Sequence, residues 1–442
     1  MAHRDTIAAI ATPPGRGGIG VVRVSGPGLQ SFASAICGKP LKPRYATLCD
    51  FRDSESRLID QGLALYFPAP NSYTGEDVLE LQGHGGPVVL NALLNTCLAA
   101  GARVAEPGEF SKRAYVNGQM DLAQAEAVAD LINASTEEAA RCAQRSIHGE
   151  FSATVHALVH GLIELRALTE ATLDFPEEEI DTGTRADQQR RLDEIQQQLA
   201  QVLLASGQGS LLREGATVVL AGRPNAGKSS LLNRLAGMDI AIVTEIPGTT
   251  RDAIRQSISL NGMPVHLIDT AGLRESTDPV EQIGIARAWS AMESADLAVL
   301  LLDAQTGETA EDRAIVNRLP EGLRILRVHN KCDLTGEAAG RGEKGITLSA
   351  KTGDGIEVLK TVIAEAIGWR GNSEGVFMAR ARHLEALQTA QRALIRAVSE
   401  NQRQEIFAEE LRAAHDALMS ITGQLTADDL LGEIFSRFCI GK

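Results

Sequence analysis

A phosphate-binding loop is the clearest chemical signal in the chain. Residues 222–229 read G-R-P-N-A-G-K-S, which matches the nucleotide P-loop pattern G-x-x-x-x-G-K-[ST]. They directly follow an apolar run of strand length at residues 217–221. In such a loop the backbone N–H groups bind phosphate oxygens, Lys228 reaches the β- and γ-phosphates, and Ser229 binds Mg²⁺. The pattern predicts a nucleotide site, and an ordinary glycine-rich turn is the alternative.

Three further motifs follow apolar runs in the same part of the chain. Residues 269–272 read D-T-A-G, a position from which an acidic residue can hold Mg²⁺ through water and a glycine N–H can sense the γ-phosphate. Taken alone, this motif is equally well explained as a turn after a strand. Residues 330–333 read N-K-C-D, and residues 349–351 read S-A-K.

The order of these motifs, with Thr250 between the first two, resembles the guanine-nucleotide-binding domain of translation-factor-type GTPases over residues 215–371. The resemblance implies that Asp333 pairs with the N1–H and the 2-amino group of guanine, which adenine cannot match. It also implies that Asn330 and Lys351 help to frame the base. Three of the nine lysines of the chain fall in these motifs. We therefore expect GTP, and not ATP, as the substrate.

The segments around the motifs alternate between strand-length apolar runs and helical stretches. The runs lie at residues 217–221, 265–268, 297–302, 325–328 and 346–348. This alternation predicts a parallel sheet with helices on both faces. From about residue 121 to residue 204, and again beyond residue 375, apolar residues recur three and four apart, which predicts amphipathic helices. We expect an α/β P-loop GTPase domain inserted into an all-α helical domain.

The first part of the chain mixes short β-branched runs with turn residues, which predicts a separate α/β domain before the helices. The expected domains are residues 1–118, residues 119–211 as the first helical part, residues 212–375 as the GTPase domain, and residues 376–442 as the second helical part. A chain of 442 residues has room for about three domains of ~150 residues, so this division is reasonable.

Composition restricts where the protein works and what it binds. Forty-three basic and 57 acidic residues give a net charge of −14, which argues against nucleic-acid binding through a general basic surface.

The six cysteines include no C-x-x-C pair, which disfavours a zinc site or a disulfide framework. The sequence has neither an apolar stretch of 18 residues nor a signal-peptide pattern. We expect a cytoplasmic protein with no membrane association.

Across essentially all 442 residues the chain resembles the bacterial tRNA-modification GTPase family MnmE, also called TrmE, of the TrmE-Era-EngA-like group. The resemblance rests on the inserted GTPase domain, on D-F-P at residues 174–176, and on the C-terminal F-C-I-G-K. The resemblance implies a tetrahydrofolate-binding N-terminal domain that forms a homodimer, and GTPase domains that meet when GTP and K⁺ are bound. It further implies that, with FAD-containing MnmG, the protein forms an aminomethyl or carboxymethylaminomethyl group at C5 of the wobble uridine in certain tRNAs.

The residues that would hydrolyse GTP differ from those of Ras-like GTPases. Leu273 follows Gly272 where a Gln would orient water, and its apolar side chain cannot hydrogen-bond. The transition state also needs a cation, which either an Arg from a partner or a metal ion could supply. The sequence favours the ion, because Asn225 and the backbone of residues 244–252 can offer oxygen ligands. Asn225 also fits as a turn residue that tolerates positive φ.

The resemblance assigns roles to individual residues. It implies K⁺ ligation by Asn225, Thr244, Ile246 and Thr249, and Mg²⁺ ligation by Ser229 and Thr250. Glu281 would position the hydrolytic water, and Arg251 would support the loop or couple hydrolysis to modification. Apart from the resemblance, Glu281 is an ordinary acidic residue at a helix start. The expected nucleotide-site residues are Asn225, Ala226, Gly227, Lys228, Ser229, Ser230, Thr244, Glu245, Ile246, Pro247, Gly248, Thr249, Thr250, Asp269, Thr270, Ala271, Gly272, Asn330, Lys331, Cys332, Asp333, Ser349, Ala350 and Lys351.

A folate site is also implied by the resemblance. Arg23 and Glu80 match positions that contact 5-formyltetrahydrofolate, and a carboxylate can accept paired hydrogen bonds from a pterin edge. Without the resemblance they are a strand Arg and a surface Glu. Gln119 stands where the family can carry a Lys, and a neutral amide cannot pair with a folate carboxylate. The resemblance ties Cys439 to the modification chemistry and Lys442 to the same pocket, although such a thiol is otherwise most often inert.

A rival function from another class is a GTP-dependent ribosome-assembly factor that binds ribosomal RNA as a switch. Relatives of that kind usually carry a basic RNA-binding module. No such module is visible in the sequence.

Overall fold

The structure is a computed structural model that describes residues 5–174, 182–238, 255–269, 293, 295–371, 375–400, 403–423, 428–436, 438–439 and 441. It divides into two compact units. Unit 1 comprises Met1–Ala129, Ile147–Ala167 and Arg403–Lys442, and unit 2 comprises Asp130–Ser146 and Leu168–Gln402. No described helix combines the length and the apolar character that crossing a membrane requires.

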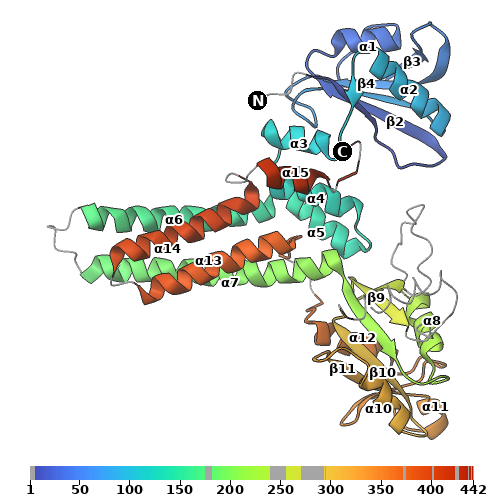
Figure 1. Cartoon of the computed structure of the whole chain (residues 1–442), viewed down its shortest axis with the longest axis vertical. Coiled ribbons are helices and arrows are strands. Elements are labelled where there is room, and N and C mark those ends of the chain that lie inside the picture. Colours follow the sequence, from blue (N-terminus) through green and yellow to red (C-terminus); the bar gives the residue numbers. More distant parts are fainter. Residues whose placement is uncertain are drawn as a thin grey trace. The chain divides into compact units, whose positions relative to one another are not determined.

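A six-stranded sheet forms the N-terminal part of unit 1 (Figure 1). Its strand order is β3-β4-β5-β2-β1-β6, and only the β1–β6 pair is parallel. The strands are β1 (Ile7–Ile10), β2 (Gly17–Gly26), β3 (Thr47–Arg52), β4 (Leu58–Phe67), β5 (Asp77–Gly85) and β6 (Arg103–Val104). Helices α1 (Gln30–Cys37) and α2 (Pro87–Ala99) cover one face, where alternate strand residues such as Val22, Val24, Leu79 and Leu81 are buried. The predicted N-terminal α/β domain is confirmed.

Helices form the rest of unit 1. They are α3 (Glu109–Val116), α4 (Leu122–Ile132), α6 (Glu150–Asp174), α14 (Gln404–Thr422) and α15 (Asp428–Ser436), and α4 and α6 continue into unit 2. Leu431, Ile434, Phe435 and Phe438 pack against α3 and α4. The ring of Phe435 lies 5.3 Å from that of Phe438 and 6.4 Å from that of Tyr115, and Tyr115 Oη donates to the carbonyl oxygen of Gly423. Phe435 and Phe438 are thereby held against α3 and α4.

The seven-stranded sheet of unit 2 has the order β12-β13-β11-β10-β7-β9-β8. The strands are β7 (Ala216–Ala221), β8 (Arg255–Leu260), β9 (Met263–Asp269), β10 (Leu297–Asp303), β11 (Ile325–Asn330), β12 (Gly340–Gly342) and β13 (Gly345–Leu348). The five strands predicted from the apolar runs are parallel to one another, and antiparallel β8 and β12 lie at the two edges. The predicted parallel sheet is therefore confirmed.

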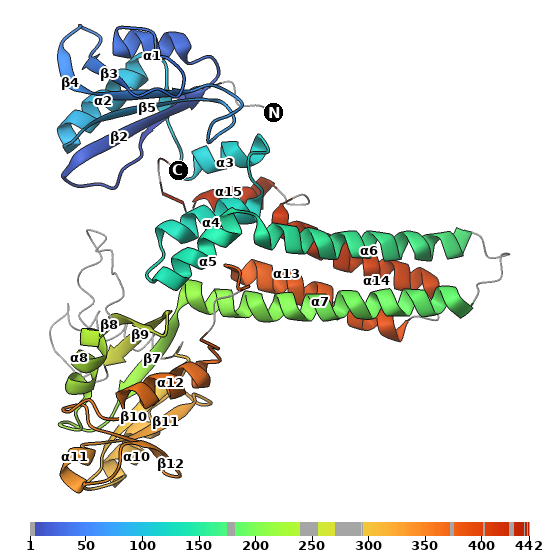
Figure 2. The same cartoon turned by 180° about the vertical axis from the view of Figure 1, so that it is seen from behind.

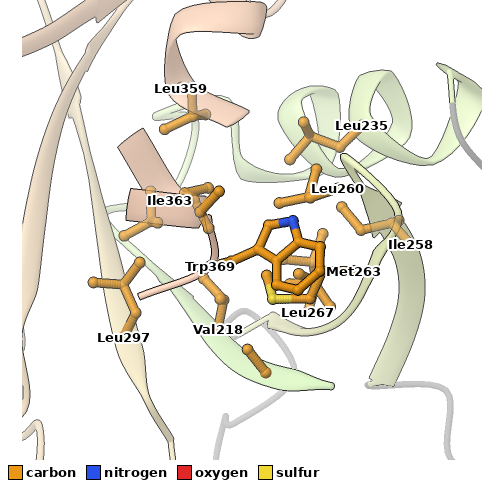
Figure 3. Packing of buried hydrophobic residues seen from close by; sticks show 14 of the residues in the cluster. Val218, Leu235, Ile258, Leu260, Met263, Leu267, Leu297, Leu359, Ile363 and Trp369 are labelled. Atoms are coloured by element: carbon orange, nitrogen blue, oxygen red, sulfur yellow. The ribbon is translucent and has the colours of Figure 1, made fainter. Parts of the chain in front are cut away.

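Helices cover both faces of this sheet, as the sequence predicts. On one face, α8 (Lys228–Met238) and α12 (Ile356–Ile367) enclose the main core. Figure 3 shows the indole of Trp369 in this core beside Leu260, Met263 and Leu267. On the other face, α10 (Ala310–Val316) contributes to a cluster with Leu300 and Leu302. Since adjacent residues of β10 face opposite cores, the strand is apolar from Leu297 to Leu302.

Unit 2 also contains α5 (Glu137–Ile147), α7 (Thr182–Glu214) and α13 (Ala381–Ser399), in addition to the short α11 (Cys332–Thr335). Figures 1 and 2 show α7 and α13 side by side. Helix α7 continues through Gly207 and Gly209 and ends next to β7. A side chain at Gly209 would collide with the carbonyl oxygen of Phe377, so the glycine permits close backbone approach.

One carboxylate contacts both chain connections of the α/β insertion. Arg213 precedes the first strand, and its Nε lies 3.1 Å from Asp130 Oδ1. Arg380 follows the insertion, and its Nη2 lies 2.8 Å from the same oxygen. The side chain of Asp130 is 7% exposed. Because such a carboxylate is costly to leave unpaired, the two connections are held together within unit 2.

Candidate functional site

The P-loop occupies the turn between β7 and α8, as the sequence predicts. Lys228 is 8% exposed, and its Nζ donates to the carbonyl oxygens of Gly222 at 2.7 Å and Arg223 at 3.0 Å. Asn225 is exposed and has φ of 63°. The loop therefore closes around the ammonium group, and Asn225 lies on its outer side in a left-handed conformation that Asn tolerates better than most residues.

Asn330 joins the other two motifs to the P-loop. Its Nδ2 donates to the carbonyl oxygen of Ala226 at 2.8 Å, and its Oδ1 accepts from the N–H of Ala350 at 2.9 Å. Asn330 is 3% exposed, and a side chain at Gly227 would collide with its amide. The N-K-x-D, S-A-K and P-loop segments consequently meet at the carboxyl edge of the sheet, the usual place for ligands in open α/β folds.

The carboxylate of Asp333 is oriented by the S-A-K segment. Its Oδ1 accepts from the hydroxyl of Ser349 at 2.6 Å, and the residue is exposed while Ser349 is fully buried. Lys351 is exposed as well, and its carbonyl oxygen accepts from the guanidinium of Arg234 on α8. Cys332, between these groups, is buried, and burial raises the pKa of its thiol. An exposed, fixed carboxylate is the group that guanine recognition needs.

Other predicted nucleotide residues are placed only in part. Ser229 and Ser230 lie exposed at the start of α8. The backbone of Asp269 ends β9 opposite Leu220 of β7, which places it next to the P-loop strand. Thirteen predicted site residues lie outside the described residues: Thr244, Glu245, Ile246, Pro247, Gly248, Thr249, Thr250, Arg251, Thr270, Ala271, Gly272, Glu281 and Lys442.

Two ion pairs that the sequence motifs do not reveal connect the site to the segment between the end of β10 and the first turn of α10. Lys331 Nζ lies 2.6 Å from Asp303 Oδ2, and Arg223 Nε lies 3.1 Å from Asp312 Oδ2. A signal for Asp312 was present, because Thr309 and Asp312 have the spacing of a capping box, and the structure forms that box. Asp303 ends an apolar strand just as Asp269 does.

Arg23 and Glu80 form a pair on adjacent strands of the N-terminal sheet. They are opposite each other in the β2–β5 register, and Arg23 Nε and Nη2 both donate to Glu80 Oε1, at 3.0 and 2.8 Å. Within the described part of the chain, no group bonds Glu80 Oε2. The guanidinium carbon lies 5.4 Å from the ring centre of Tyr73 and 5.9 Å from that of Phe110. The pair therefore combines a carboxylate oxygen with a guanidinium group that lies beside the partly exposed Tyr73 and the buried Phe110.

The C-terminal tail reaches the same group. Arg23 Nη1 lies 3.5 Å from the carbonyl oxygen of Gly441, and the carbonyl oxygen of Cys439 accepts from the N–H of Gly108 at 3.3 Å. Cys439 itself is exposed. Gln119 is exposed and lies against Gly75, close in sequence to Tyr73. The structure thus brings the predicted folate residues Arg23 and Glu80 next to the tail.

A buried ion network supports this region. The guanidinium of Arg113 is 1% exposed and lies 2.9 Å from Asp5 Oδ1, 3.0 Å from Glu76 Oε2 and 2.9 Å from Glu109 Oε1. Glu76 also accepts from Ser25 Oγ of β2. Because Glu76 follows Tyr73 by three residues, the network fixes the loop that holds the Tyr73 ring beside Arg23.

Comparisons with known proteins show the family. A model described as the MnmE helical domain matches residues 122–439, and one described as the GTP-binding protein TrmE N-terminus matches residues 6–119. A tRNA modification GTPase MnmE of Nitrosomonas eutropha is 61% identical over 100% of both chains. The chain belongs to the MnmE family of tRNA modification GTPases. The MnmE protein of Neisseria meningitidis serogroup B is 56% identical over 99% of each chain.

MnmE membership confirms the resemblance and the GTPase activity that the motifs predict. The MnmE helical-domain match spans the α/β insertion, which confirms an inserted P-loop domain. Full-length similarity to tRNA modification GTPases does not favour the ribosome-assembly alternative. The solved G domain of the T. maritima FeoB iron transporter is 28% identical, with a TM-score of 0.25, over 34% of this chain and 98% of its own.

Proposed function

We propose that this protein hydrolyses GTP in its α/β insertion and uses that reaction, together with MnmG, to modify tRNA. The product would be 5-carboxymethylaminomethyl or 5-aminomethyl uridine at the wobble position of certain tRNAs. The protein would act in the cytoplasm as a homodimer formed through its N-terminal domain. The observation that carries the proposal is the meeting of the P-loop, N-K-x-D and S-A-K segments through Asn330, in a chain similar along its whole length to tRNA modification GTPases.

The nucleotide site is proposed on the geometry of the described groups. Lys228 would exchange its carbonyl contacts for the β- and γ-phosphates, and Ser229 would bind Mg²⁺ with Thr250. Asp333 would accept the N1–H and 2-amino groups of guanine, since its carboxylate is exposed and held by Ser349. Asn330 would act on the base indirectly, because both ends of its amide already bond the backbone. Glu281 would position the attacking water.

K⁺ would bind at the P-loop, with Asn225 as its side-chain ligand and Thr244, Ile246 and Thr249 as further ligands. The exposed amide of Asn225 fits this role, because carbonyl oxygens suit hard cations and the side chain is on the outer side of the loop. A bound cation would supply positive charge beside the transferring phosphoryl group, in place of an arginine finger.

Two substitutions separate cation binding from turn formation at Asn225. We expect Asn225→Gly to keep nucleotide affinity, because Gly adopts a φ of 63° without strain, and to lose the stimulation of GTP hydrolysis by K⁺. Asn225→Ala should lose the same stimulation with slightly weaker GTP binding, since positive φ costs Ala about 1 kcal/mol. Hydrolysis rates in KCl and in NaCl measure the effect. A K⁺ response kept by Asn225→Gly would show that Asn225 only shapes the turn.

The N-terminal domain would bind 5-formyltetrahydrofolate or a related one-carbon folate at Arg23 and Glu80. Glu80 Oε2 could accept from the pterin edge while Oε1 keeps the two Arg23 bonds, and the partly exposed Tyr73 ring could contact the flat ring. Gln119, Cys439 and Lys442 would complete the pocket from the loop side and the tail. The bound folate would supply the one-carbon unit.

Glu80→Gln tests this site, because it keeps the shape of the side chain but replaces one acceptor oxygen of the carboxylate with an N–H₂ group. We expect binding of 5-formyltetrahydrofolate to weaken by about 10-fold, the effect of losing a hydrogen bond to a charged group. Isothermal titration of the full-length protein measures it. Glu106→Gln, an exposed residue of the same domain, is the matched control and should bind the folate normally. Unchanged affinity in Glu80→Gln would contradict the folate assignment.

Nucleoside analysis of tRNA from a strain that lacks the gene distinguishes this function from the ribosome-assembly alternative. Loss of the modified wobble uridine is expected. Unchanged wobble uridines would contradict the proposal.

A further inference from the structure

Two carboxylates, one on each side of the loop between β10 and α10, bond back to the nucleotide-binding segments. Asp303 is the last residue of β10, and Asp312 lies in the first turn of α10. In the sheet β10 lies between β7, which leads into the P-loop, and β11, which leads into N-K-x-D. The loop after β10 is therefore placed to reach both segments.

Asp312 forms an ion pair with Arg223 of the P-loop. It is fully buried, and its two carboxylate oxygens lie 3.1 and 3.2 Å from Arg223 Nε. Arg223 Nη2 also donates to Thr306 Oγ1 of the same loop at 2.8 Å, and the carbonyl oxygen of Arg223 accepts from Lys228. Thr309 bonds Asp312 Oδ2 through its N–H and its hydroxyl, so the carboxylate cannot turn away from Arg223. A buried carboxylate held in this way fixes the start of the P-loop.

Asp303 forms an ion pair with Lys331 of the N-K-x-D motif. Its Oδ2 lies 2.6 Å from Lys331 Nζ, and its Oδ1 accepts from the N–H of Gln305 at 2.9 Å. The hydrogen bond from Lys331 holds the pKa of the Asp303 carboxyl below its ordinary value, so this side chain is charged at neutral pH. Lys331 has φ of 71°, an unusual conformation for a residue with a side chain, and needs support from its surroundings. Asp333 follows it by two residues.

We propose that Asp303 and Asp312 are positioning residues for the nucleotide, with Asp303 holding the guanine-binding segment and Asp312 holding the P-loop through Arg223. The proposal rests on the nucleotide site proposed above. Neither carboxylate contacts the nucleotide in this account. Asp303 acts through Lys331, and Asp312 acts through Arg223. The segment that joins the two carboxylates thereby sets the distance between the base-binding and phosphate-binding groups.

The two carboxylates have different consequences for binding. Loosening Lys331 shifts Asp333 and should reduce discrimination between guanine and a base that lacks the 2-amino group. Loosening Arg223 alters the P-loop and should weaken binding of both bases alike, because both nucleotides carry the same phosphates. GDP and IDP are a suitable pair of probes, since inosine differs from guanosine only in that amino group.

The experiment measures GDP and IDP binding to full-length Asp303→Asn, Asp312→Asn and wild-type protein. Asp303→Asn should reduce the preference for GDP over IDP by about fivefold, and Asp312→Asn should weaken both nucleotides by about 10-fold with the preference unchanged. Arg223→Lys should bind more tightly than Arg223→Gln, because it keeps the charge facing Asp312. Arg341→Gln, which breaks an exposed ion pair with Glu365 in the same domain, is the control and should match wild type.

Thermal unfolding of the same samples distinguishes a loss of folded protein from a change in nucleotide binding by folded protein. Folded variants with wild-type affinities and an unchanged GDP preference would overturn the proposal. If Asp312→Asn does not fold, Asp303→Asn still tests the role of Asp303 in guanine binding, because the Asp303 side chain is 17% exposed. The two Arg223 variants then test the role of the Arg223–Asp312 pair in positioning the P-loop. A wild-type protein that shows no preference for GDP over IDP would instead contradict the proposed guanine site.

Discussion

Replacing Asp333 with Asn is expected to change the preferred nucleotide from GTP to XTP. Ser349 donates to Oδ1 of Asp333, so an Asn should keep its carbonyl oxygen toward Ser349 and present its amide N–H₂ to the base. That group cannot accept from the 2-amino group of guanine, but it can donate to the C2 carbonyl of xanthine. A bidentate base contact contributes about 1–3 kcal/mol, so GTP binding should weaken by up to about 100-fold.

Competition of GTP and XTP against a fluorescent guanine nucleotide measures the change. Asp354→Asn is the matched control, because Asp354 is a nearby exposed carboxylate that bonds Thr352. It should keep the preference for GTP. A variant Asp333→Asn that binds GTP as wild type does would show that the base is recognised elsewhere.

Replacing Lys228 with Ala is expected to reduce the rate of GTP hydrolysis by about 100-fold or more, because charge developing on the phosphates would lose the ammonium group that stabilises it. The substitution also removes the bonds from Nζ to the carbonyl oxygens of Gly222 and Arg223, which close the loop before nucleotide binds. Single-turnover hydrolysis at saturating GTP separates this effect from weaker binding.

Lys344→Ala is the control for Lys228→Ala. Lys344 is exposed in the hairpin of β12 and β13, and its removal should leave the rate unchanged. Hydrolysis at a wild-type rate by Lys228→Ala would contradict the P-loop assignment. An equal loss in Lys344→Ala would point to a general effect of charge.

Elements with strong local patterns could be predicted from the sequence. The apolar runs at residues 265–268 and 297–302 lie within β9 and β10, because a strand covered on both faces needs little polar surface. The positions of the P-loop and N-K-x-D at the ends of parallel strands follow from the same reasoning. The antiparallel edge strands β8 and β12 have no comparable apolar run and were not predicted.

The pairing of side chains could not be predicted, because it depends on register between strands distant in sequence. Asn330 illustrates this, since the resemblance implies only that it helps to frame the base, whereas its amide connects Ala226 to Ala350. Arg23 and Glu80 are 57 residues apart, and only the β2–β5 register makes them neighbours. The Asp303–Lys331 pair likewise depends on β10 and β11 lying side by side.

The most direct test of the whole account joins GTP recognition to tRNA modification. A strain that lacks the gene is complemented with wild-type protein, Asp333→Asn or Asp354→Asn, and the wobble uridines of its tRNA are measured by mass spectrometry. We expect wild type and Asp354→Asn to restore the modified nucleoside, whereas Asp333→Asn should not, because the cell supplies GTP and not XTP. Full restoration by an Asp333→Asn protein that no longer binds GTP would contradict the account.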